Sequence, residues 1–227
     1  SLQANTISSS NSAFGYKSLF TSTGRSNSAF GDRSLSSNTS GNSNCAFGSG
    51  SLWKNTTGAR NSSFGANAGS NITTGANNTC VGSNSQASSA TVNNEITLGD
   101  SSIEALRCNI TTISTLSDIR DKTDINTFIN GLNIIDSVRP VTFRWDKREW
   151  YNNGIRDGSK SDTNIRVGFI AQELKQMMIN NNCSYLDLVY ENNIDKLEAK
   201  AGNLFVPLVR AVQELHDRVK QLEAKLK

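Results

Sequence analysis

Asn11-Ser-Ala-Phe-Gly15 is the first copy of a motif that recurs through the first half of the 227-residue chain. The later copies are Asn27-Ser-Ala-Phe-Gly31, Asn44-Cys-Ala-Phe-Gly48, Asn61-Ser-Ser-Phe-Gly65 and Asn78-Thr-Cys-Val-Gly82. Their last glycines are spaced 16, 17, 17 and 17 residues apart. Two other elements keep this period: the glycines Gly24, Gly41, Gly58 and Gly75, and the pairs Ser18-Leu19, Ser34-Leu35 and Ser51-Leu52. Such a period indicates a stack of equivalent units.

Each repeat predicts two short strands, the Ala-Phe-Gly piece and the Ser-Leu piece, separated by turns rich in Gly, Ser, Asn and Thr. Each piece carries one or two apolar residues, so we expect that one chain alone cannot bury a useful core. Three chains wound together would enclose the stacked Phe side chains and remove open sheet edges. The composition also fits a disordered linker, but disorder does not require Phe at a fixed phase. The repeats resemble the β-roll of trimeric adhesin heads and phage tail-fibre shafts, so residues 1–90 predict a trimeric β shaft.

Residues 91–116 differ from the repeats because apolar residues mostly alternate there, which predicts short strands that close the shaft as a triple β-helical neck. The residues concerned are Val92, Ile96, Leu98, Ile103, Leu106, Cys108, Ile110 and Ile113. Charge also changes near residue 116. Residues 1–116 hold 6 Lys+Arg and 4 Asp+Glu, whereas residues 117–227 hold 17 and 16. Two different architectures are therefore expected to meet at this point.

Several classes of function are disfavoured by composition. The net charge of +3 is too small to favour a nucleic-acid partner. No run of 18 or more apolar residues is present, so membrane insertion is not expected. The four cysteines form no CxxC pair, and His216 is the one histidine. We therefore expect no metal site and no cofactor.

The segment Ser117-Asp-Ile-Arg-Asp-Lys-Thr-Asp-Ile125 opens the charged half of the chain. Three apolar stretches follow it, at residues 132–145, 167–174 and 204–215. In this order they resemble the endosialidase-type intramolecular chaperone domain, whose hallmark is Ser-Asp-x-Arg-x-Lys followed by an acidic–apolar pair. That domain follows phage tailspikes, tail fibres and neck appendages, and a relative occurs in myelin regulatory factor. The resemblance implies an α+β core over 117–202 that trimerises, registers three β-structured chains and then cuts itself away.

Ser117 and Lys122 are the candidate catalytic pair. A serine hydroxyl is a poor nucleophile until a base takes its proton, and a lysine can be that base when burial lowers its pKa. The Ser117 hydroxyl can reach the preceding carbonyl through a five-membered ring, which predicts cleavage between Leu116 and Ser117. The Ser117–Asp118 bond is the alternative. Asp118 and Arg120 are expected to support the site as turn, cap or ion-pair residues.

The spacing of the pair sets a geometric condition. Residues five apart lie roughly 17 Å from each other in an extended strand, on opposite faces. Lys122 therefore reaches Ser117 only if the chain turns between them, or if the lysine comes from a neighbouring subunit. His216 falls on an expected C-terminal helix, which makes a histidine triad hard to build.

Periodicity outlines the rest of this half. Apolar residues at 3–4 residue spacing predict a helix of about 14 residues from Ile125, with Asp124 as N-cap and an end at Arg139-Pro140. Strands are predicted at 141–145, 167–170 and 186–190, and a helix at 171–178. Residues 203–227 predict a coiled-coil helix whose heptad places Val212, Val219 and Leu226 at a, and Leu208, Leu215 and Leu222 at d.

Together these features predict a viral tail fibre or tailspike, assembled in the host cytoplasm and located in the virion. The expected partners are two copies of itself, upstream fibre domains, and a host-surface receptor or glycan. The expected enzyme activity is one self-cleavage by a Ser-Lys serine endopeptidase. The alternative is a non-enzymatic trimeric adhesin shaft with an uncleaved coiled-coil domain. A glycan-cleaving spike is disfavoured because paired carboxylates do not stand out in the shaft.

Overall fold

The computed structural model describes residues 9–109 and 113–226. The chain forms two compact units, Ser1–Ser114 and Thr115–Lys227, and each is described by itself. Three sequence predictions fall partly outside the described residues: the start of the shaft at residues 1–8, the neck at residues 110–112, and the coiled-coil helix at Lys227.

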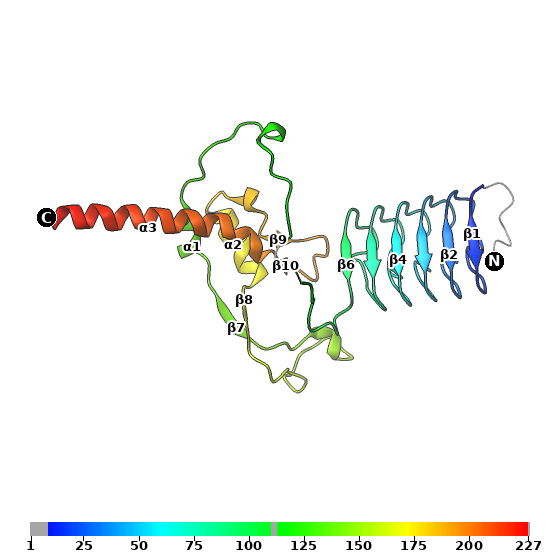
Figure 1. Ribbon diagram of the computed structural model, residues 1–227. Coiled ribbons are helices and arrows are strands. Elements are labelled where there is room, and N and C mark those ends of the chain that lie inside the picture. The colour runs from blue at the N-terminus through cyan, green and yellow to red at the C-terminus, as the bar shows by residue number, and fades with distance from the viewer. Residues whose placement is uncertain (1–8, 110–112, 227) are drawn as a thin grey trace. The chain divides into compact units, whose positions relative to one another are not determined.

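The first unit is a β-solenoid in which each coil contributes one strand to a single parallel sheet (Figure 1). The strands are stacked in chain order and in register, so Phe14 pairs with Phe30 and Phe30 with Phe47. They are β1 (Ser12–Phe14), β2 (Ser28–Phe30), β3 (Cys45–Phe47), β4 (Ser62–Phe64), β5 (Thr79–Val81) and β6 (Ile96–Leu98). The predicted repetitive β shaft is confirmed.

The Ser-Leu pieces are not strands, which corrects the sequence prediction. Leu19, Leu35 and Leu52 have φ values of 48°, 50° and 51°, in the left-handed region. Their side chains are fully buried inside the solenoid. A left-handed leucine is disfavoured by about 1–2 kcal/mol, and burial of its side chain contributes about 1.5–3 kcal/mol in return. These leucines therefore turn the chain while they fill its centre.

A single chain does bury a core, so the expectation that it could not was wrong. The interior is a column of small and branched apolar side chains: Leu19, Ala29, Leu35, Ala46, Leu52, Ala68, Ile72, Cys80, Ala87 and Val92. The Phe side chains lie on the outside instead. Phe30 and Phe47 are each 38% exposed, and their rings stack with centroids 4.8 Å apart. The phenylalanines thus form a ladder on the outer surface of the solenoid and are not part of the core of the single chain.

Buried asparagines join each coil to the next. The side-chain amide of Asn27 donates to the Gly41 carbonyl at 2.9 Å, and its oxygen accepts from the backbone N–H of Asn44 at 2.9 Å. Asn44 and Asn61 repeat this arrangement in the following coils, with Gly58 and Gly75 as acceptors. Asn78 does the same with the Val92 carbonyl. Every polar atom of the amide needs a partner when it is buried. The motif asparagine therefore specifies the spacing between coils.

The ladder ends at Glu95, which takes the asparagine position in the last coil. Its backbone N–H donates to the Asn78 side chain at 3.0 Å, but its carboxylate accepts from the Ser88 N–H at 2.7 Å. A carboxylate cannot donate to a further coil. Beyond β6, residues 99–109 form no strand, and Ile103 and Leu106 are exposed. Within the predicted neck, residues 91–116, Ile96–Leu98 form β6 of the shaft sheet. The triple β-helical arrangement stays a prediction, because its alternating apolar residues would need neighbouring chains to cover them.

We predict that Asn61→Ala weakens the shaft by roughly 2–4 kcal/mol, because it leaves two buried groups without their partner. These are the Gly75 carbonyl and the Asn78 N–H. Native-state hydrogen exchange of the β4 and β5 amides measures the loss. Thr57→Ala is the control, since Thr57 is exposed in the same coil. Equal protection in both variants would contradict a stabilising ladder.

The second unit is an α+β domain (Figure 1). Its helices are α1 (Gly131–Asp136), α2 (Ala171–Asn180) and α3 (Phe205–Lys225). Its strands pair as two antiparallel hairpins, β7 (Val141–Phe143) with β8 (Arg166–Gly168), and β9 (Val189–Tyr190) with β10 (Glu198–Ala199). Short 3-10 segments lie at Ile119–Asp121, Arg148–Trp150, Ser184–Leu186 and Ala201–Leu204. In the core, one face of α2 packs against the segment that follows the helix. The residues concerned are Leu174, Met177, Met178, Cys183 and Leu188.

The helix predicted from Ile125 is much shorter in the structure, because α1 starts only at Gly131. Asn130 before it is left-handed, with φ 65°, and the expected N-cap Asp124 is left-handed as well, with φ 52°. Contact with α3 explains this start. A Cβ on Gly131 would lie 2.6 Å from the Ala211 nitrogen. The Glu214 carboxylate accepts from the N–H groups of Gly131 and Leu132 at 3.3 and 2.8 Å, so a side chain of α3 caps α1.

We predict that Glu214→Gln loosens α1 at neutral pH and not in acid. The Leu132 N–H, followed by the Gly131 N–H, lowers the pKa of Glu214. A lowered folded-state pKa stabilises the fold above the ordinary glutamate pKa of about 4.3, and this stabilisation is lost as pH falls through the lowered value. Hydrogen exchange of residues 131–136 at pH 7 and at pH 3 measures the effect. Glu223→Gln, at an exposed position on the same helix, should leave the exchange unchanged at both pH values. If Glu214→Gln lost the same protection at pH 7 and at pH 3, the charge of the carboxylate would be ruled out as the cause.

Candidate functional site

The junction segment 113–118 has no helix or strand, and its side chains are exposed. Leu116 is fully exposed. The chain then turns through the 3-10 segment Ile119–Asp121, which Asp118 caps. The peptide bond between Leu116 and Ser117 therefore lies in accessible, irregular backbone just before a turn.

Asp118 and Arg120 build this turn. One Asp118 carboxylate oxygen accepts from the Arg120 backbone N–H at 2.9 Å and from its Nε at 3.0 Å. The other oxygen accepts from Arg120 Nη2 at 2.6 Å. The Arg120 side chain, and then its backbone N–H, hold the pKa of Asp118 below its usual range. The two residues predicted to support the site thus form a fork-shaped ion pair together with a backbone cap.

The turn brings the predicted catalytic pair together. Lys122 Nζ donates to Ser117 Oγ at 2.5 Å within the same chain. In the single chain, the turn is enough to bring Lys122 to Ser117. Both side chains are exposed. The geometry places a potential base beside a hydroxyl that adjoins the Leu116 carbonyl.

Other residues that could carry chemistry are differently placed. His216 is exposed on α3. Burial raises the pKa of the Cys80 thiol to about 11, which disfavours the nucleophilic thiolate. Across residues 9–109 and 113–226, no cluster of three or more His, Cys, Asp or Glu could hold a metal ion. The same residues include no helix that is both long and apolar enough for a membrane span.

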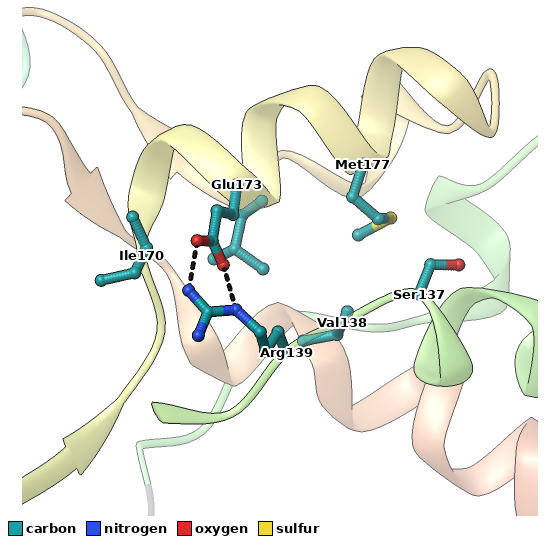
Figure 2. A pocket seen from close by; sticks show the side chains of 7 residues that line it. Ser137, Val138, Arg139, Ile170, Glu173 and Met177 are labelled. Atoms are coloured by element: carbon teal, nitrogen blue, oxygen red, sulfur yellow. Dashed lines mark hydrogen bonds and ion pairs between the residues drawn. The ribbon is translucent and has the colours of Figure 1, made fainter. Parts of the chain in front are cut away.

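A small cavity lies between α2 and the end of α1. The side chains that line it make structural contacts with each other, and it is too small for a substrate. Figure 2 shows the Arg139 guanidinium facing the Glu173 carboxylate across it, and Arg139 Nε donates to Glu173 at 3.0 Å. This ion pair lowers the pKa of Glu173. The cavity volume of about 30 Å³ is far below that of a ligand pocket. Glu173 therefore joins α2 to the segment before β7.

The comparisons with known proteins concern the second unit of the chain. Residues 117–181 match the family model Peptidase_S74, described as chaperone of endosialidase. The match begins at Ser117 and ends just after α2. No curated protein and no solved structure matches the chain. The family match confirms the resemblance drawn from the sequence and supports a chaperone and self-cleaving role. The second unit of this chain thus carries an endosialidase-type chaperone domain, which starts at the serine that Lys122 contacts.

Proposed function

We propose that this chain is the C-terminal part of a homotrimeric viral tail fibre or tailspike, whose chaperone domain assembles three chains and then releases itself. The proposal rests on one observation above all. The 2.5 Å contact between Lys122 Nζ and Ser117 Oγ lies at the first residue of the chaperone match. A Ser-Lys pair at a domain boundary can supply both the nucleophile and the base of a single self-cleavage.

The cleavage chemistry follows from the order of atoms along the chain. Neutral Lys122 accepts the Ser117 hydroxyl proton, and Oγ attacks the Leu116 carbonyl carbon. The bond between that carbon and the Ser117 nitrogen breaks, and the nitrogen leaves as an amine after it receives the proton. The product is an ester between Leu116 and Ser117 Oγ. Water hydrolyses this ester, which gives a Leu116 carboxylate and a new N-terminus at Ser117.

Assembly would activate the pair. Lys122 donates in the observed hydrogen bond, and as a base it must accept instead. Removal from water disfavours a charged ammonium, but both side chains are exposed in the single chain. In the proposed trimer, neighbouring copies cover the junction and supply this burial. Cleavage then reports that three chains have met in the correct arrangement.

Two exposed apolar surfaces support a trimer. The first is the heptad face of α3, defined as Leu208, Val212, Leu215, Val219, Leu222 and Leu226, all of which are exposed. An open groove of about 310 Å³ adjoins the start of this helix and is lined in part by Phe128 and Phe205. The second surface is the external Phe ladder of the shaft. Apolar faces of this extent are typical of surfaces that bind another chain.

We predict that Ser117→Ala leaves the protein assembled and uncut, because it removes only the hydroxyl. Lys122→Arg should also block cleavage, since arginine does not give up its proton. A denaturing gel and N-terminal sequencing check both; the wild type should give two fragments, the second beginning Ser-Asp-Ile-Arg. Ser114→Ala, an exposed serine three residues upstream, should cut normally. Cleavage of Ser117→Ala would remove Ser117 from the chemistry, and an uncut wild type would favour the non-enzymatic adhesin.

We predict that Val219→Asp weakens trimerisation and slows self-cleavage, because it places a charge on the heptad face of α3. Light scattering of uncut Ser117→Ala protein should give about three times the 24.6 kDa chain mass, and Val219→Asp in that background should lower it. Ala224→Asp adds the same charge at an exposed position off the heptad face and serves as the control. A monodisperse monomer in the Ser117→Ala protein would contradict the architecture.

A further inference from the structure

The charged groups of the junction are arranged in a specific way. They are Asp118, Arg120, Asp121, Lys122 and Asp124. Asp118 and Arg120 pair with each other. Within the part of the chain that the structure describes, no ion pair joins Lys122 to a carboxylate, and its ammonium contacts the Ser117 hydroxyl. The carboxylate of Asp118, four residues before Lys122, is thus engaged by Arg120.

This engagement matters for a lysine that has to act as a base. A carboxylate within a few ångströms stabilises the charged ammonium, and an ammonium cannot take a proton from serine. Asp118 caps the 3-10 segment and Lys122 follows it directly, so one short turn separates the two residues. Both Asp118 oxygens are instead engaged by Arg120, through contacts at 3.0 and 2.6 Å. Arginine suits this task because it stays charged and presents a planar fork.

We propose that Arg120 is a positioning residue of the self-cleavage reaction: it holds the Asp118 carboxylate away from Lys122, so that the lysine is directed to Ser117. The Asp118–Arg120 pair is exposed, with the Arg120 side chain 85% accessible, so it contributes little to stability. Its role is to select the partner of Lys122. This inference rests on the proposed self-cleavage, whose own test is the Ser117→Ala variant.

The geometry separates this role from a structural one. The backbone N–H of residue 120 supplies the cap contact to Asp118, so Arg120→Gln keeps the turn and frees the carboxylate. Asn is also a good capping residue, so Asp118→Asn keeps the turn and removes the charge. The double variant Asp118→Asn/Arg120→Gln therefore has the turn, but neither the arginine nor the competing carboxylate.

The test is the pH dependence of first-order self-cleavage in the full chain, with trimer formation checked in parallel. Arg120→Gln should move the half-maximal rate upward by about one pH unit, with about a tenfold slower rate on the low-pH side and an unchanged maximum. Asp118→Asn and the double variant lack the competing carboxylate, so neither should show the upward shift of the half-maximal pH, whatever their maximum rate. Arg139→Gln, which breaks the ion pair with Glu173 away from the junction, should leave the wild-type profile unchanged.

Each outcome decides the matter. An Arg120→Gln shift that disappears in the double variant supports the proposal. An unchanged profile in Arg120→Gln, a uniform loss of rate without a shift, or a shift that persists in the double variant overturns it. If Arg120→Gln fails to trimerise, Asp118→Asn still tests the idea, because loss of cleavage there would show that the carboxylate itself is needed. Failure of self-cleavage as such is visible separately, in the wild type and in Ser117→Ala.

Discussion

The asparagine ladder is the interaction on which the shaft depends. The motif asparagines donate to a backbone carbonyl and accept from the next backbone N–H, as Asn44 does with Gly58 and Asn61. A coil has too few apolar residues to fix its position by packing alone. Hydrogen bonds of defined length and direction do so instead, and a buried amide without them would be unfavourable. The Leu and Ala column then fills the space that the ladder defines.

The same regularity creates a difficulty for assembly. Neighbouring coils are nearly equivalent, since Phe30, Phe47 and Phe64 occupy one column with similar surroundings. Two shafts displaced by one coil would still bring phenylalanine against phenylalanine, so the ladder specifies register weakly. A unique element is needed outside the repeats. In the proposed trimer the heptad face of α3 is such an element. It occurs once in the chain and lies outside the repeats of the shaft.

Sequence reasoning found the period, the strands and the junction because each depends on local pattern. It misplaced the Ser-Leu pieces because an apolar residue does not show whether it fills a strand or a left-handed turn. It extended a helix back to Ile125 because the contact of Gly131 with α3, which sets the start of α1, lies about 80 residues away in the chain. It named Ser117 and Lys122 from their family pattern, but the turn that joins them depends on Asp118 side-chain bonds that periodicity does not reveal.

The buried core of the single chain changes what a chaperone has to supply. Had the shaft lacked a core, the chaperone would have to remain attached in order to hold it folded. Each coil instead closes on its own Leu, Ala and Asn side chains, and Glu95 ends the ladder before the junction. The shaft is thus complete on the upstream side of the Leu116–Ser117 bond. In the proposed trimer, a chaperone that provides register rather than core could leave once the three chains are aligned. The proposed cleavage would make that alignment one-way, because the cut product would lack the element that lets the chains search for register again.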